Sequence, residues 1–123
     1  MKNINKTMEL MANGMTISKA LAEVYKTRNV QIPFKKCDLK IPVEKVGFCN
    51  RAMRCFDDAK LKTVAQVVDY INKNGYKSFH YLGKATAIDI SEHLLDLAWS
   101  KLNKTERAEF LLLVDEENEA KED

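Results

Sequence analysis

The chain has 123 residues, of which 46% are hydrophobic and 31% are charged. This length is typical of one domain, and the composition excludes a wholly disordered chain. Its 20 basic and 18 acidic residues give a formal charge of +2, so net charge alone indicates neither a nucleic acid nor a membrane as partner.

The charge is unevenly distributed along the chain. Residues 115–123 hold six acidic residues and one lysine, a charge of −5, which leaves +7 on residues 1–114. A basic body with an acidic tail favours an anionic partner.

The first predicted elements are two helices and a connector. Residues 4–13 predict a short helix, and residues 16–28 an amphipathic one, because apolar side chains recur there at helical spacing. Pro33 and Pro42 then bracket residues 30–45, which form either a connector or a pair of short strands.

The second half of the chain predicts more helices. One covers Phe48–Asp58, and Thr63 caps the next, which ends at Asn74-Gly75. A short turn or helix at Tyr76–Tyr81 leads into a long helix after Gly83.

Asn103 or Thr105 caps a last helix before the acidic tail frays, with Asp115, Glu116 and Glu117 solvated. Trp99 is expected to pack this last helix onto the rest of the domain. The order predicts an all-α fold in three segments. These are an N-terminal helical segment with its connector (1–45), a central helical unit (46–100), and a C-terminal helix with the tail (101–123).

Several classes of protein are not indicated. The three cysteines contain no CxxC pair and there are only two histidines, so neither a disulfide scaffold nor a metal site is suggested. No catalytic spacing or phosphate-binding P-loop occurs, so we expect no enzyme and no cofactor. The N-terminus lacks a signal peptide and no segment is apolar enough to span a membrane. We therefore expect a cytoplasmic protein with reduced thiols.

Two short motifs carry the functional signal. Arg51 and Arg54 lie three apart on one predicted helix and can point the same way. Gly83, Lys84 and Thr86 stand at a predicted helix start, where a missing Cβ, free N–H groups and the helix dipole favour an anion such as phosphate. The alternative is that Gly83 merely permits a tight turn and the arginines are solvated.

The stretch from about Ile41 to Leu97 resembles the C-terminal domain of the bacterial RNA polymerase alpha subunit. Two motifs and the distance between them agree. The matching positions are Arg51, Ala52 and Cys55, then Leu82-Gly83-Lys84, and then Ile90, with Thr86 where the family has Ser and Asp89 where it has Glu. The chain departs from the family pattern at Arg54, where the family has Asn, and at Ala85, where it has a second Lys. It also lacks the assembly domain of an alpha subunit, which favours a free-standing relative.

The resemblance implies a helix-hairpin-helix unit and a transcription-associated protein that contacts DNA phosphates and the minor groove. Arg51, Arg54, Gly83, Lys84 and Thr86 would form the contact surface, and Cys55 would be a packing position. RNA polymerase or a transcription factor is a further expected partner. The alternative is a protein-interaction module without DNA affinity, which binds such a partner or forms a homodimer through its Met-rich first helices.

A helix-turn-helix reading of residues 6–28 is weaker. Leu10 is bulky where such motifs usually need a small residue, and Ile17, Leu21 and Val24 are needed for the core. A packing or dimerising helix is the favoured interpretation of this region.

Overall fold

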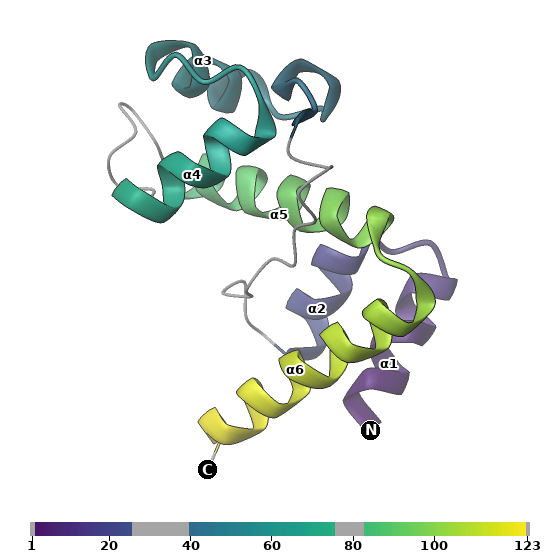
Figure 1. The fold of residues 1–123 in the computed structure, drawn as a ribbon. Helices are drawn as coiled ribbons and strands as arrows, with labels where there is room; N and C mark the ends of the chain where they lie inside the picture. The colour runs from purple at the N-terminus through teal and green to yellow at the C-terminus, as the bar shows by residue number, and fades with distance from the viewer. Residues whose placement is uncertain (1, 26–39, 76–82, 123) are drawn as a thin grey trace.

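The computed structural model describes residues 2–25, 40–75 and 83–122, with side chains described up to Asn118. Six α-helices account for most of these residues, and no strand occurs among them (Figure 1), which confirms the predicted all-α class. The elements are α1 (Lys2–Ala12), α2 (Ile17–Tyr25), the 3-10 turn η2 (Val43–Lys45), α3 (Asn50–Asp58), α4 (Val64–Asn74), α5 (Lys84–Lys101) and α6 (Lys104–Glu122).

The segment predicted as a connector or strand pair lies partly outside the described residues. Its described part, residues 40–45, makes a single β-bridge between Pro42 and Thr63 and then enters the turn η2. The turn or helix predicted at 76–81 lies outside the described residues, and so does the chain directly before Gly83, where the implied helix-hairpin-helix unit would have its hairpin.

Local capping signals set several helix ends as expected. Thr63 accepts a hydrogen bond from the Gln66 backbone, while the Gln66 side chain bonds back to the Thr63 N–H, forming a capping box. Gly75 ends α4 with φ 74°, a conformation that favours glycine. Of the two candidate caps for α6, Asn103 makes the reciprocal pair with Glu106.

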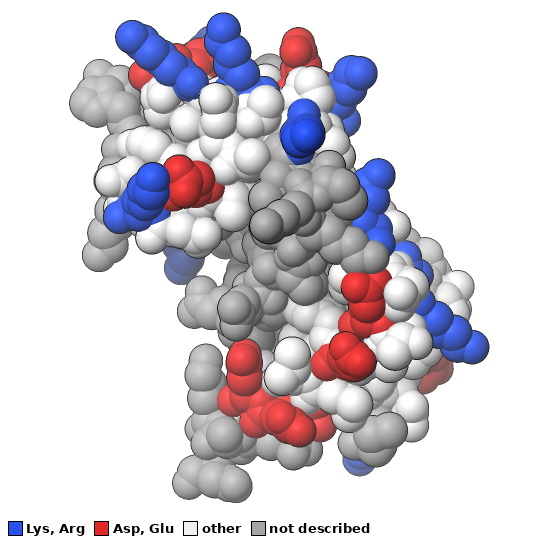
Figure 2. Space-filling model, viewed as in Figure 1, with Lys and Arg blue, Asp and Glu red and all other residues white. Residues whose placement is uncertain are grey.

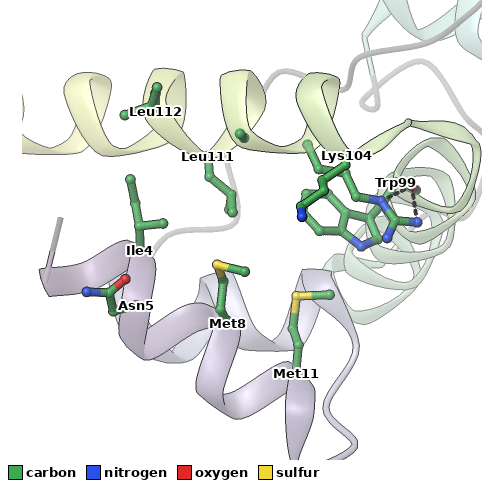
Figure 3. Close-up of a pocket in the computed structure, with 10 residues that line it drawn as sticks. Ile4, Asn5, Met8, Met11, Trp99, Lys104, Leu111 and Leu112 are labelled. Carbon is green, nitrogen blue, oxygen red and sulfur yellow. Dashed lines mark hydrogen bonds between the residues drawn. The ribbon is translucent and has the colours of Figure 1, made fainter.

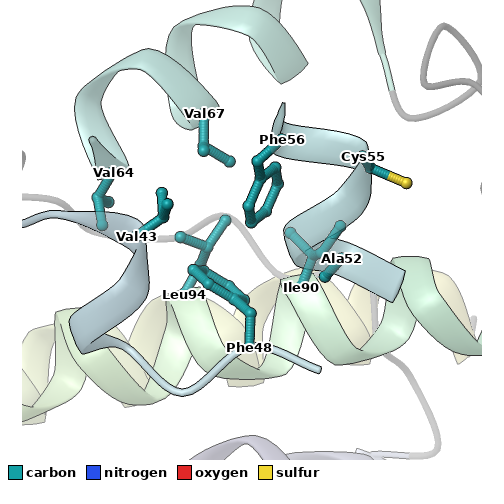
Figure 4. Packing of buried hydrophobic residues seen from close by; sticks show 9 residues of the cluster. All are labelled: Val43, Phe48, Ala52, Cys55, Phe56, Val64, Val67, Ile90 and Leu94. Carbon is teal, nitrogen blue, oxygen red and sulfur yellow. The ribbon is translucent and has the colours of Figure 1, made fainter. Parts of the chain in front are cut away.

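The buried side chains form two hydrophobic clusters that share α5. We call the first the α3–α4 core; it also receives Ile90 and Leu94 from α5 (Figure 4). We call the second the α1–α6 core; it joins α1, α2 and α6 and receives Leu95 from α5. Because α5 is buried on more than one side, it connects the two cores.

Two carboxylates of α5 bind the N-terminal ends of other helices. Asp89 accepts a hydrogen bond of 3.0 Å from the backbone N–H of Cys49, the N-cap of α3. Asp96 accepts two bonds of 3.0 Å from Ser18 in the first turn of α2. N–H groups at helix starts have no intrahelical acceptor, so these bonds hold α3 and α2 against α5.

The last helix corrects one prediction about the acidic tail. Asp115 is buried and accepts a 2.9 Å hydrogen bond from the Tyr25 hydroxyl, so it is not a solvated tail residue. The helix continues to Glu122, whereas Glu116 and Glu117 are exposed as expected. The tail therefore begins as a packed helix, because residue 115 falls on the inward face of α6.

Trp99 packs the last helix onto the domain, as predicted. Its ring meets Phe110 of α6 edge-on at 6.0 Å between centroids, and the Arg107 guanidinium lies 4.9 Å from the ring centroid. Arg107 also donates two hydrogen bonds to the Trp99 carbonyl at the end of α5. None of the described helices combines the length and apolar character that a membrane crossing needs.

Candidate nucleic-acid interface

Helix α3 presents two arginines to solvent. Its buried residues, Ala52, Cys55 and Phe56, face the α3–α4 core, whereas Arg51 and Arg54 are exposed. The helix is short and strongly amphipathic, so the arginines share its outer side. The structure thus places both predicted arginines on one accessible surface.

Neither arginine pairs directly with an acidic side chain in the described part of the chain. Among the described residues, no ion pair includes Arg51, Arg54 or Lys84. Asp89 of α5 lies near the start of α3, and each of its carboxylate oxygens contacts another group. Oδ2 accepts from Cys49, and Oδ1 lies 3.3 Å from the Nδ1 of His93.

The predicted anion-binding helix start is present at α5. Gly83 is the N-cap of α5, with extended backbone angles and no side-chain cap, and both Gly83 and Lys84 are exposed. The first intrahelical bond runs from the Ala87 N–H to the Gly83 carbonyl. The N–H groups before Ala87 therefore point out of the helix end, where the dipole favours an anion.

The fold itself does not require glycine at position 83. Its φ is −86°, which any residue adopts. A Cβ built there would meet no atom within 4 Å. At Gly83 itself, neither the backbone conformation nor the surrounding space calls for glycine, and the residues of the turn before it lie outside the described part of the chain.

The bond between Asp89 and Cys49 joins the two helices that carry the motifs. Cys49 precedes Arg51 by two residues, and Asp89 lies five residues after Lys84, or about 7.5 Å along the helix axis. The start of α3 is therefore bonded to the second turn of α5. The sequence showed the motifs separately, without this link.

Thr86 does not share the exposure of the other candidate residues. It is 4% exposed, and it lies one helical turn before the buried Ile90 on the inward side of α5. This burial does not fit the predicted contact between its hydroxyl and phosphate. Cys55 is buried as well, and burial raises the pKa of its thiol, with smaller contributions from Asp58 and Cys49.

The charge around this surface differs from that of α6. Residues 40–75 include seven basic and four acidic residues, whereas residues 104–122 include three basic and seven acidic. In Figure 2 basic side chains stand around the α3 end with acidic ones among them, and acidic ones gather beside the C-terminal part of α6. The acidic end of α6 thus lies away from α3 (Figure 1).

The N-terminal pair of helices uses its apolar face for packing. Gly14 connects α1 and α2 with φ 102°, and Ile17, Ala20 and Leu21 of α2 are buried. These residues pack in the α1–α6 core or against α5, which is the role expected of a packing helix. Among the described residues, no group of three His, Cys, Asp or Glu is placed to hold a metal ion.

Comparisons of this chain with protein-family models, curated proteins and solved structures find no match.

Proposed function

We propose that this chain is a small, transcription-associated protein that binds double-stranded DNA. Its contact surface consists of Arg51 and Arg54 on α3 together with Gly83 and Lys84 at the start of α5. The observation that carries the proposal is the link between these motifs. Two exposed arginines without an ion-pair partner among the described residues lie on a helix whose start is bonded, from Cys49 to Asp89, to the second turn of α5, five residues after the exposed Lys84.

The roles of these residues follow from their chemistry. The open helix start and Lys84 bind phosphate, because free N–H groups and an ammonium both attract an oxyanion. Arg51 and Arg54 lie where they reach along the backbone or into a narrow minor groove, whose negative potential attracts arginine. Thr86 is left out of the contact surface because it is buried. The surface is small, so binding is weak or assisted by a partner protein.

Titration of the chain with a fluorescent duplex tests this proposal. Three neutralised phosphates give a slope of about −3 for the logarithm of affinity against the logarithm of salt concentration. Arg51→Ala should weaken binding and bring the slope about one unit closer to zero. An A/T-rich duplex should bind more tightly than a G/C-rich one, because its minor groove is narrower.

Lysines at the two ends of α5 provide a matched control. Lys84 and Lys101 are both exposed, and Lys101 lies at the end of the helix distant from Gly83. Lys84→Ala should weaken DNA binding, whereas Lys101→Ala should leave it unchanged. Equal effects of the two variants, or affinity independent of salt, would contradict the proposal and favour the protein-interaction module.

A further inference from the structure

An open apolar groove with a volume of about 670 Å³ lies between α1 and α6. Ile4, Met8 and Met11 of α1 point toward α6, and Leu111 of α6 points back (Figure 3). The charged residues in its lining, Lys104 and Arg107, are both cations, and they lie on the part of α6 near its start.

Exposed apolar side chains gather around this groove. Among the described residues, three large hydrophobic side chains are exposed: Met8 at 57%, Leu112 at 45% and Leu113 at 58%. All three belong to α1 or α6, and Met8 and Leu112 line the groove. Apolar surface of this kind, bordered by charge, is typical of an interaction site.

One row of α6 residues beside the groove is complementary to itself. Lys104, Ala108, Leu112 and Glu116 follow each other at intervals of four, so they lie along one side of the helix, and all four are exposed. The row reads basic, small, large, acidic. When two copies of this row run antiparallel, each basic residue faces an acidic one and each large residue faces a small one.

We propose that this face binds a second copy of the chain, with the two α6 helices antiparallel about a twofold axis level with residue 110. Lys104 then faces Glu116 of the second copy. Leu112 faces Ala108 of the second copy and enters the groove of that second copy beside its Met8. Each contact occurs twice because a twofold interface is isologous. The small Ala108 allows the helices to approach closely.

The neighbouring row of α6 does not have this property. Glu109, Leu113 and Glu117 also lie four apart and are exposed. Antiparallel copies that meet on this row with Leu113 facing Leu113 would set Glu109 against Glu117, which places like charges together. The charge pattern therefore selects the row of Leu112 and not that of Leu113 as the contact.

Two matched leucine variants test the location of the interface. Sedimentation equilibrium should show the mass rising with concentration from 14.1 kDa toward twice that value. Leu112→Glu should raise the dissociation constant of the dimer at least tenfold, and Leu113→Glu should change it less than twofold. Both side chains are exposed, so circular dichroism should show unchanged helix content. A wild-type chain that stays monomeric at millimolar concentration, or equal effects of the two variants, would overturn the proposal.

A charge exchange tests the pairing itself. Lys104→Glu and Glu116→Lys should each weaken the dimer at low salt, because each alone sets like charges together. An equal mixture of the two variants should restore dimerisation, since both pairs in the mixed dimer are then oppositely charged. A mixture no more dimeric than its components would refute this pairing, whatever the leucine variants do.

These outcomes are separate from those of the DNA proposal. The row lies on α6, whereas the proposed DNA contacts lie on α3 and at the start of α5. A monomeric Leu112→Glu chain should therefore keep the intrinsic DNA affinity of a single subunit. Loss of dimerisation and loss of DNA binding are thus distinguishable.

Discussion

Asp96 of α5 caps helix α2 through Ser18, whose backbone N–H and hydroxyl each donate a hydrogen bond of 3.0 Å to its carboxylate. Seven residues earlier on α5, Asp89 accepts the N–H of Cys49 at the start of α3. Helix α5, which connects the two cores, therefore also holds the start of α2 and the start of α3. Charged acceptors at such N–H groups are among the stronger hydrogen bonds in proteins.

Replacing Asp96 should destabilise the fold. Asp96→Ala removes both carboxylate oxygens that accept from the buried Ser18, and we expect the free energy of unfolding to fall by about 1–2 kcal/mol. Urea denaturation measures this as a lower midpoint with an unchanged slope. Asp69→Ala is the control, because Asp69 pairs with Lys73 on the exposed surface of α4 and such pairs contribute about 0.5 kcal/mol or less. Equal midpoints for the two variants would show that the cap does not stabilise the fold.

Replacing Gly83 should separate DNA binding from stability. In Gly83→Ala the new Cβ meets nothing within the chain, but it lies where the proposed phosphate approaches the backbone. Alanine is a poorer N-cap, yet it lowers the entropy of the unfolded chain, so stability should change by less than about 1 kcal/mol. We expect DNA affinity, measured by fluorescence anisotropy, to fall several-fold while the melting temperature stays nearly constant. Undiminished affinity would place the phosphate elsewhere.

The thiol of Cys55 should be unreactive in the folded protein. Cys55 is 4% exposed, and burial, followed by Asp58 and Cys49, raises its pKa. A thiol reagent applied to a chain whose other cysteines are serine should label Cys55 only as fast as the protein unfolds. Fast labelling under native conditions, before any loss of helical signal, would contradict this burial.

The same pKa shift should make stability depend on pH. The folded thiol keeps its proton at pH values where the unfolded thiol loses it, so the unfolded state binds fewer protons. Stability should therefore fall as the pH rises above about 8.5, the ordinary pKa of a cysteine thiol. Urea denaturation of Cys55→Ala between pH 7 and pH 10 should show a smaller decline than the wild type. If the stability of Cys55→Ala falls as much as that of the wild type, groups other than Cys55 cause the pH dependence.

Helix positions and helix ends could be predicted from the sequence because their causes are local. Thr63 and Gln66 are three residues apart, as are Asn103 and Glu106, so each capping box is visible as a short pattern. Gly75 follows its helix directly and takes a positive φ. The arginines of α3 and the Gly-Lys start of α5 were recognisable for the same reason.

The sequence did not reveal which acidic residues are structural. Asp115 sits in a run of acids that reads as a solvated tail, yet it binds Tyr25, 90 residues earlier. Asp96 and Asp89 bind groups 78 and 40 residues away. No local pattern marks such residues, because their partners become neighbours only when the helices pack.

The division of charge along the chain, a basic body of +7 and an acidic end of −5, was set by the sequence alone. Only the tertiary structure decided which of those charges remain accessible. It leaves Arg51, Arg54 and Lys84 exposed, buries Asp115, and turns Thr86 inward. The physical reason is that a side chain's exposure depends on which face of its helix meets the shared helix α5, and α5 is buried against two separate cores.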